Sequence, residues 1–388
     1  MWLSSILNFL SPSSLRSRSR RRPSSRRRPA ARPLTLEALD ERILPSFLTP
    51  VSYLTGSSPE AVVVADLNGD GKLDLVTVNY STLSVLLGNP IGVGNADGTF
   101  QPPQNFATGY GPRSVAVGDF NGDGKLDLAT ANSYDVSVLP GNGDGTFQPN
   151  SNIVIGSDNP QSVAVGDFNG DGKLDLVVTS NLSVFDGFGY YGPYYHYEGH
   201  ANVLLGNGDG SFAAPNTSDL GIGVHTSAAV ADFNGDSKLD FATVNSDYGT
   251  VSVLLGDGTG VLGAATDFSA EYYVQSVAAG DVNGDSKPDL VTANPYYYDN
   301  VGVLLGNGAG GFAAAQYYAA GGYPASVVLG DFDGDTTLDI ATANYSSNDV
   351  SVLRGIGNGV FLPAVNSASG AGPNAVAAGD FNGDGWLD

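Results

Sequence analysis

Aspartates recur in this sequence at a spacing that suits a divalent cation. The pattern Asp-x-Asn/Asp-x-Asp-x-x-x-Asp begins at Asp66 and returns six more times, at intervals of 53, 48, 65, 49, 50 and 49 residues. Alternate residues of a tight loop point inward, so oxygens at positions 1, 3 and 5 can converge on one ion, and a backbone carbonyl from position 7 can join them. Oxygen coordination without His or Cys favours calcium over zinc or copper, and a flexible loop suits calcium better than magnesium.

The pattern therefore predicts up to seven calcium sites, with ligands at positions 1, 3, 5 and 9 of each loop. The predicted ligands are Asp66, Asn68, Asp70, Asp74, Asp119, Asn121, Asp123, Asp127, Asp167, Asn169, Asp171, Asp175, Asp232, Asn234, Asp236, Asp240, Asp281, Asn283, Asp285, Asp289, Asp331, Asp333, Asp335, Asp339, Asp380, Asn382, Asp384 and Asp388. An EF-hand would carry Glu at position 12, where the first two loops have Thr77 and Thr130.

The loops are not identical. Glycine follows the third ligand in four of them, but Ser237, Ser286 and Thr336 take that place in the fourth, fifth and sixth, and Pro288 occupies position 8 of the fifth. We expect these three loops to bind more weakly or with strain. The alternative is that Asp, Asn and Gly only make a good turn between two strands, although carboxylates so close together repel one another without an ion.

Short strands must position these loops, because no segment shows a 3.6-residue apolar rhythm. In the second repeat we predict strands over 114–120, 126–131 and 136–139, a glycine-rich hairpin turn, and a weak fourth strand from Phe147 onward. Four-stranded units of about 50 residues cannot bury both faces alone, so they must stack. An aromatic insert near 185–200 interrupts the third unit and explains its longer interval.

The phase of the repeat predicts how the units are arranged. Residues 47–66 align with 100–119, so the ordered chain opens with a fourth strand and reaches Asp388 at the end of the seventh loop. The expected fold is all-β, a β-propeller of about seven four-stranded blades over residues 47–388, with the last blade split and incomplete. The chain looks like a C-terminally truncated ring that an intact protein would continue.

Charge divides the chain into two parts. The first 46 residues hold ten basic and three acidic residues, whereas the remaining 342 hold seven basic and 37 acidic ones. Such an acidic body repels nucleic acid and anionic membranes and attracts cations. No apolar run is long enough for a transmembrane helix, and the absence of cysteine leaves packing and metal to support the fold.

Residues 1–46 allow more than one interpretation. They read as a disordered basic tail, while 16–46 resembles the leader of some large bacterial surface proteins. A secretory signal would place the basic residues before the apolar ones, the reverse of the order here. A nucleic-acid-binding arm is disfavoured because the acidic body would oppose it.

The repeats resemble the FG-GAP repeats, also called VCBS-type repeats, of integrin-α-like propellers. The resemblance rests on Asp-Phe-Asn-Gly-Asp-Gly-Lys-Leu-Asp at 119–127 and 167–175 and on Leu-Leu-Gly-Asn-Gly at 204–208. It implies a seven-bladed propeller with calcium loops between the first two strands of each blade. It also implies service in adhesion or recognition, with some members appended to enzymes.

Seventeen of the nineteen tyrosines lie where the connections opposite the loops are expected. Those between the second and third strands hold Tyr80, Tyr134, the run 190–197, Tyr248, the run 296–298 and Tyr345, and those before each first strand hold Tyr53, Tyr110, Tyr272, Tyr273 and Tyr323. Tyrosine gives a large amphipathic contact surface at low entropy cost, which suits sugars or protein partners. The residues proposed for a ligand face are Tyr134, Tyr194, Tyr195, Tyr296, Tyr297 and Tyr298. Alternatively, these rings only cover the blade tops.

Catalysis has little support in the sequence. The three histidines are His196, His200 and His225, and His196, Glu198 and His200 could alternate along a strand and share one side. We interpret the histidines as solvated loop residues. No nucleophile elbow, phosphate loop or cysteine nucleophile is present.

The expected function is a calcium-binding, non-enzymatic recognition or adhesion module, exported or displayed at the cell surface. Its partner would be a protein or carbohydrate, and it would act as a monomeric propeller or within a longer chain. The alternatives are an enzyme or enzyme accessory with carbohydrate or phosphoester chemistry, and a structural spacer of a larger surface protein.

Overall fold

A computed structural model describes residues 50–89, 98–156, 158–189 and 192–388. The described residues all fall within one compact unit, which spans 47–388. The predictions made for 1–46 lie outside the described residues. Within the described part, no helix has the length and apolarity needed to cross a membrane.

This compact unit contains six four-stranded antiparallel sheets, each a simple meander in chain order. The first three are β1 (Ala61–Ala65), β2 (Asp74–Val78), β3 (Thr82–Leu86) and β4 (Gln104–Ala107); β5 (Ser114–Gly118), β6 (Asp127–Ala131), β7 (Val136–Leu139) and β8 (Ser151–Ile153); β9 (Asn159–Gly166), β10 (Asp175–Gly189), β11 (Gly192–Leu204) and β12 (Asn216–Ile222). The other three are β13 (His225–Ala231), β14 (Asp240–Asn245), β15 (Thr250–Leu254) and β16 (Thr266–Ser269); β17 (Ser276–Gly280), β18 (Asp289–Asn294), β19 (Asn300–Leu304) and β20 (Gln316–Ala319); β21 (Pro324–Gly330), β22 (Asp339–Asn344), β23 (Asp349–Leu353) and β24 (Val365–Ala368).

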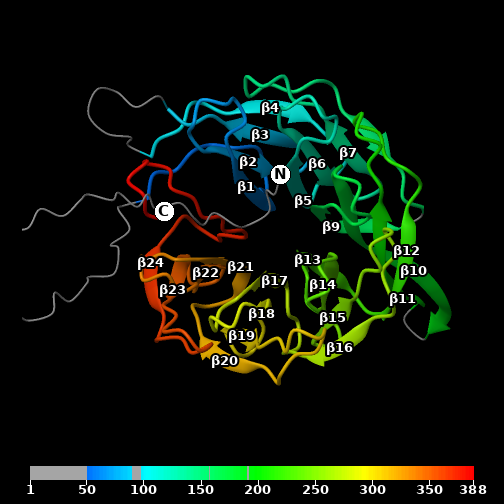
Figure 1. Ribbon diagram of the computed structural model, residues 1–388, viewed down its shortest axis with the longest axis vertical. Helices are drawn as coiled ribbons and strands as arrows, with labels where there is room; N and C mark the ends of the chain where they lie inside the picture. Colours follow the sequence, from blue (N-terminus) through cyan, green and yellow to red (C-terminus); the bar gives the residue numbers. More distant parts are fainter. Residues whose placement is uncertain (1–49, 90–97, 157, 190–191) are drawn as a thin grey trace, which may run out of the picture. The chain divides into compact units, whose positions relative to one another are not determined.

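The sheets follow one another around a ring, with the first strand of each nearest the centre (Figure 1). First strands of neighbouring sheets contact each other from β1 through β5, β9, β13 and β17 to β21. This is the all-β propeller that the sequence predicts, and we call the sheets blades 1 to 6.

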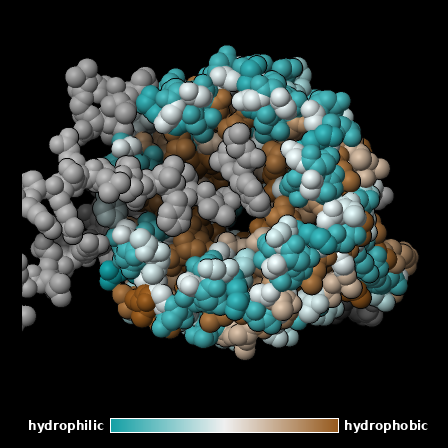
Figure 2. Space-filling view, viewed as in Figure 1, coloured by the Kyte–Doolittle hydropathy of each residue, from teal (hydrophilic) through white to brown (hydrophobic). Residues whose placement is uncertain are grey.

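The core lies between neighbouring blades. Val76, Val78 and Leu83 of blade 1 pack with Leu128 and Leu139 of blade 2, and similar clusters recur around the ring. In blade 2 the second and third strands are buried on both faces, which is why they read as continuous apolar runs. Figure 2 shows hydrophobic residues towards the inside of the ring and mostly hydrophilic residues over the blades.

The predicted number of blades is wrong: the described residues form six four-stranded blades, not seven. Residues 369–388 form no strand. Gly379 and Asp388 exchange backbone hydrogen bonds of 3.3 and 2.9 Å, but the second-strand position begins only at Asp388, so no ladder follows. The segment instead fills an inner position, with the Val376 N–H donating to Ser326 Oγ of blade 6 and Gly379 lying against Val64 and Leu73 of blade 1.

The aromatic insert is not an irregular connection. It lengthens β10 and β11 into a hairpin whose pairing continues from Leu176–Leu204 to Gly189–Gly192, with a bulge between Phe185 and Gly187. Alternating aromatic side chains favour an extended strand, so Tyr194 and Tyr195 belong to β11.

Candidate metal loops and tyrosine face

Each acidic loop folds around its first aspartate. In the second loop, Asp119 Oδ1 accepts backbone N–H groups from Gly122 at 2.7 Å and Asp123 at 3.2 Å, and Oδ2 accepts that of Gly124 at 2.9 Å. The same carboxylate–amide pattern recurs in the other loops, including the seventh. The first ligand position therefore lies at the centre of a ring of backbone donors.

Positions 3 and 5 lie on the same turn. Asn121 Oδ1 accepts the N–H of Asp123 at 2.8 Å, and Asp123 Oδ1 accepts the N–H of Lys125 at 3.0 Å. An oxygen that accepts one such bond keeps a second lone pair. The geometry thus leaves oxygen lone pairs at positions 1, 3 and 5 for a cation.

The ninth-position aspartate has a different environment, because it begins the second strand of each blade and is fully buried. Asp127 Oδ2 accepts the N–H of Phe120 at 2.9 Å, and Oδ1 accepts that of Gly141 at 2.7 Å. Burial raises the pKa of this carboxyl above its usual value and raises that of Asp289 and Asp339 to about 6. This residue ties the start of the loop to the end of the third strand, a structural role that the spacing alone did not reveal.

Position 6 requires a left-handed backbone. Gly71 and Gly124 have φ of 81° and 80°, while Ser237, Ser286 and Thr336 are held at 64°, 64° and 73°. Such a conformation is costly for a β-branched residue like threonine. The fourth to sixth loops thus hold a residue with a side chain in a left-handed conformation, and their weaker or strained binding stays a prediction.

A lysine at position 7 was missed in the sequence. Lys125 Nζ lies 3.6 Å from Asp123 Oδ2, and four other loops have the same pair at 3.2–3.7 Å. The sixth loop has Thr337 there, and its extra carboxylate, Asp333, is approached by Arg354 at 3.5 Å. These cations offset part of the carboxylate repulsion.

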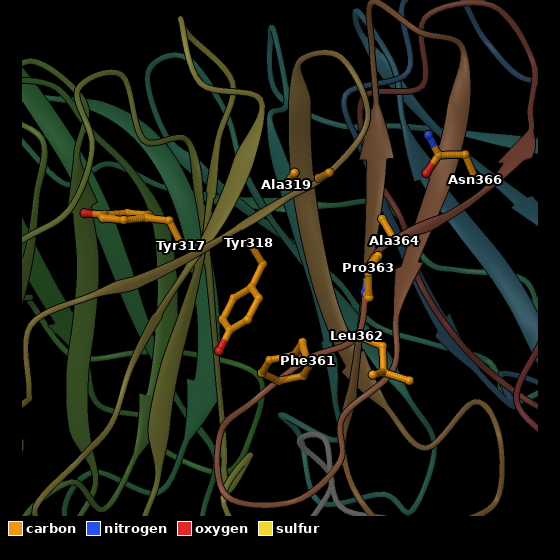
Figure 3. Close-up of a pocket in the computed structure, with 9 residues that line it drawn as sticks. Tyr317, Tyr318, Ala319, Phe361, Leu362, Pro363, Ala364 and Asn366 are labelled. Atoms are coloured by element: carbon orange, nitrogen blue, oxygen red, sulfur yellow. The ribbon is translucent and has the colours of Figure 1, made fainter.

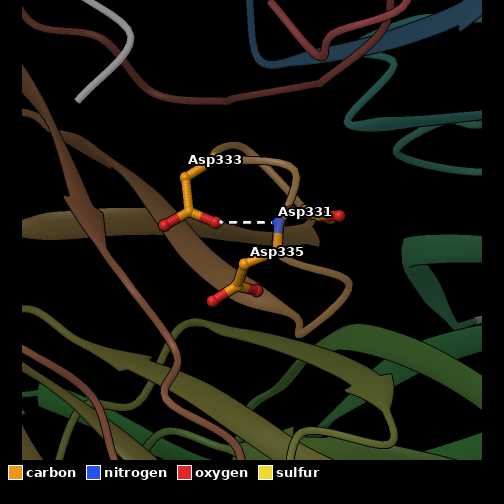
Figure 4. Close-up of side chains that lie close together, drawn as sticks. All are labelled: Asp331, Asp333 and Asp335. Atoms are coloured by element: carbon orange, nitrogen blue, oxygen red, sulfur yellow. Dashed lines mark hydrogen bonds between the residues drawn. The ribbon is translucent and has the colours of Figure 1, made fainter. Parts of the chain in front are cut away.

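The sixth loop is the most acidic. Asp331, Asp333 and Asp335 each offer an oxygen within 4.8 Å of the others (Figure 4). Asp333 Oδ1 accepts the N–H of Asp335 at 3.2 Å, the bond that Asn makes at position 3 of the other loops. In the other loops, the amide oxygen of Asn at position 3 therefore occupies the place that the Asp333 carboxylate occupies in the sixth loop.

On the opposite side, the connections carry two groups of tyrosines whose rings contact one another, mostly in tilted or edge-to-face arrangements. Tyr80, Tyr110 and Tyr134 of blades 1 and 2 have ring centroids 5.3 and 6.3 Å apart. A second group, which we call the blade 5–6 tyrosine series, connects Tyr273 to Tyr296 at 4.6 Å, Tyr296 to Tyr323 at 5.7 Å and Tyr323 to Tyr345 at 5.7 Å.

The six tyrosines proposed for a ligand face are all exposed, but the structure does not bring them together. Tyr134 lies in the first group and Tyr194 and Tyr195 on the long hairpin, while the run 296–298 is at the blade 5–6 series. Tyr53 was placed on this face by sequence, and that placement is wrong. Its hydroxyl accepts the N–H of Phe100 and its ring packs on Phe100, which contacts Phe381 of the seventh loop.

The histidines are not solvated loop residues. His196 and His200 lie on β11, with His196 Nδ1 2.7 Å from Asp186 and Nε2 3.4 Å from Glu198, and His200 Nδ1 2.6 Å from Asp158. The hydrogen bonds to Asp186 and Glu198 raise the pKa of His196, and the bond to Asp186 has the larger effect. His225 begins β13 and is fully buried.

A hollow of about 470 Å³ lies between the outer strands of blades 5 and 6, lined by β20 and residues 361–366 (Figure 3). Tyr318 turns toward Phe361 there and donates its hydroxyl hydrogen to the Gly359 carbonyl at 3.1 Å, while Tyr317 points away. This hollow holds packing contacts between blades.

Comparison with protein families agrees with the repeat pattern. The FG-GAP-like repeat matches residues 66–130, 119–178, 232–292, 281–342 and 331–388. The chain belongs to the FG-GAP-like repeat family. The unmatched residues 179–231 of this FG-GAP-like protein include most of the long β10–β11 hairpin. No curated protein matches the sequence.

Solved structures share the fold at low identity. The chain is similar to a putative 6-phosphogluconolactonase from Bacteroides uniformis, with a TM-score of 0.60 and 16% identity over 84% of this chain and 89% of that one. It is also similar to a lectin from Agrocybe aegerita that recognises non-reducing terminal N-acetylglucosamine, with a TM-score of 0.52 and 23% identity over 80% of each chain. A third similar structure is a periplasmic gluconolactonase from Pseudomonas aeruginosa, with a TM-score of 0.53 and 16% identity over 81% of this chain and 86% of that one. These likenesses establish the propeller fold alone.

Proposed function

We propose that this FG-GAP-like protein is a calcium-stabilised, non-enzymatic recognition module. The observation that carries the proposal is the sixth loop, where three carboxylates present oxygens within 4.8 Å of one another. Each other loop repeats the same backbone scaffold with Asn at position 3.

The donor set fits calcium. Positions 1, 3 and 5 offer carboxylate and amide oxygens, and no nitrogen or sulfur ligand belongs to the loops. Hard oxygen ligands on a flexible turn suit Ca²⁺, which accepts six to eight of them, about two more than Mg²⁺ at the upper end. Bound calcium would supply positive charge at the junction of the first two strands of each blade.

Recognition is assigned to the side opposite the loops, where exposed tyrosines gather. A rigid amphipathic ring gains contact area at low entropy cost. The partner would be a protein or a carbohydrate, and nucleic acid is disfavoured because residues 47–388 carry 37 acidic and seven basic side chains.

Adhesion outside the cell follows as part of the proposal. Extracellular calcium modules bind with Kd on the order of 10⁻⁴–10⁻³ M, so loops of this strength would fill where calcium is abundant. A monomeric propeller or one unit of a longer surface chain fits equally. If the propeller binds calcium but no ligand, it would act as a purely structural spacer of a larger surface protein.

Equilibrium calcium binding, followed by isothermal titration calorimetry, tests the proposal. We expect several sites per chain for the wild-type protein and one fewer for Asp331→Asn/Asp333→Asn/Asp335→Asn. The matched control Asp247→Asn lies between β14 and β15, outside the loops, and should keep every site. Absence of calcium binding at millimolar concentration would refute the proposal.

A second candidate is a hydrolase acting on carbohydrate or phosphoester bonds. The favouring observation is His196, held between Asp186 and Glu198 on the long hairpin, an arrangement suited to proton transfer. His196→Ala should abolish any hydrolysis measured on p-nitrophenyl glycosides or on p-nitrophenyl phosphate. Unchanged hydrolysis, or none in the wild-type protein, removes this candidate.

A further inference from the structure

The blade 5–6 tyrosine series contains a backbone anomaly. Tyr273 and Tyr323 have φ of 63° and 61°, in the left-handed region. They stand just before the first strand of blades 5 and 6, where the corresponding residues of two other repeats are Gly111 and Gly372, with φ of 61° and 60°. Two repeats have therefore placed a bulky side chain at a position that glycine fills without strain.

Strain of this kind is unfavourable and persists where the surroundings enforce it, often at ligand sites. The Tyr323 N–H donates to Asp299 Oδ1 at 2.7 Å, and its hydroxyl accepts from Gln275 Nε2 at 3.1 Å. Tyr297, next to the series, also has a positive φ of 68° and is 82% exposed. The protein thus maintains a left-handed backbone at the exposed rings of Tyr273 and Tyr297 and at the half-buried ring of Tyr323.

The series ends at a hollow. About 630 Å³ opens between the connection after β24 and the start of β1, lined by Tyr345, Ser58, Glu60, Asn374 and neighbouring residues. This volume falls in the range of small-molecule sites, roughly 300–1,000 Å³. A row of rings and an adjacent hollow form one continuous surface through Tyr345.

The charge around this surface selects the ligand class. None of the seven Lys and Arg residues of 47–388 belongs to the series or lines the hollow, and five of them are the position-7 lysines of the loops. Glu60 and Asp299 provide carboxylates there. An anionic ligand would be repelled, whereas carboxylates accept hydrogen bonds from hydroxyl groups.

We propose that the blade 5–6 tyrosine series and its hollow bind a neutral oligosaccharide. Flat C–H faces of successive sugar units would lie on Tyr273, Tyr296 and Tyr323, and the chain would continue past Tyr345 into the hollow. Hydroxyl groups would donate to Asp299 and Glu60. This inference rests on the proposed recognition function and names its ligand class and place.

Binding of neutral hexasaccharides, measured by calorimetry in calcium, tests the inference. The probes are chitohexaose, cellohexaose, maltohexaose and mannohexaose, with an oligogalacturonate as the anionic comparison. We expect at least one neutral probe to bind, and Tyr323→Gly and Tyr296→Leu each to weaken it at least tenfold. Tyr317→Ala, on β20 and outside both the series and the hollow, is the matched control and should leave affinity unchanged.

Stability separates a binding role from a packing role. Tyr323→Gly relieves a positive φ, so its melting temperature should equal or exceed that of the wild-type protein while binding is lost. A lowered melting temperature with retained binding would mean that Tyr323 is a packing residue and would overturn the inference. So would binding of the anionic probe alone, or of no probe. Those results leave the calcium proposal intact, because calcium binding to the loops is measured without sugar.

Discussion

The loop side and the tyrosine side of this propeller differ in how faithfully they repeat. On the loop side, the ninth-position aspartate accepts the same two backbone N–H groups in all six blades. On the tyrosine side, one structural position holds Ser58, Gly111, Tyr273, Tyr323 or Gly372. A feature needed by every blade stays constant, whereas a feature used once can vary. The constant side holds the fold together, and we place recognition on the variable side.

The largest expected effect comes from the constant side. Asp127→Ala leaves the buried N–H groups of Phe120 and Gly141 without an acceptor, at about 1–3 kcal/mol for each group. We expect urea denaturation to show a loss of several kcal/mol. Asp123→Ala is the exposed control from the same loop and, in the absence of calcium, should cost less than about 1 kcal/mol. Equal losses would show that the ninth position has no special structural role.

The next largest effect is a loss of stability on acidification, which we attribute to His225. Burial lowers its pKa to about 4 from 6.5, and its Nδ1 donates to the Gly223 carbonyl at 3.3 Å. The unfolded chain therefore binds more protons between these pH values, and the stabilising contribution, present above pH 6.5, is lost as pH falls. We expect a difference on the order of 3 kcal/mol.

The measurement compares wild-type and His225→Asn unfolding at fixed calcium from pH 7 to pH 4. The comparison is necessary because the raised pKa values of the ninth-position aspartates act with the opposite sign. Parallel pH profiles for the two proteins would contradict a neutral, buried His225.

A smaller effect tests the inequality among the loops. Thr336→Gly relieves a φ of 73° and should stabilise the protein by about 1 kcal/mol. Gly124→Thr, in the second loop, is the reverse substitution and should cost a similar amount. Chemical denaturation with chelator isolates the backbone effect. An unchanged free energy of unfolding in both variants would show that position 6 tolerates a side chain freely.

The smallest effect on stability belongs to the variable side. The variant Tyr296→Ala/Tyr297→Ala/Tyr298→Ala changes exposed side chains and should alter the free energy of unfolding by less than about 1 kcal/mol while abolishing ligand binding. Calcium-dependent melting should be unchanged. Unaltered ligand binding would remove these residues from the recognition face.

Much of the fold could be predicted because local patterns determine it. The strand predicted over 136–139 is β7, and the strands expected near 114–120 and 126–131 are β5 and β6 within two residues. The blade count could not be read this way, since Val376 lies in a segment whose pattern matches other first strands but which has no ladder partner.

The site was predictable only in part. The spacing of the aspartates located every loop. It did not reveal that Asp127 is buried and accepts the N–H of Gly141, 14 residues further along the chain. His225 is buried because its ring lies against Gly199 of the neighbouring blade, where a Cβ would come within 2.1 Å of Nδ1. The positive φ of Tyr323 likewise follows from contacts with Gln275 and Asp299. Such contacts join distant residues and leave no local signal.

Thermal melting in chelator and in millimolar calcium tests the central claim most directly. If cations at the acidic loops stabilise the propeller, the melting temperature should rise with calcium and follow its concentration through the binding range. The rise should shrink in Asp331→Asn/Asp333→Asn/Asp335→Asn and remain full in Asp247→Asn. An identical melting temperature in chelator and in calcium would contradict the account.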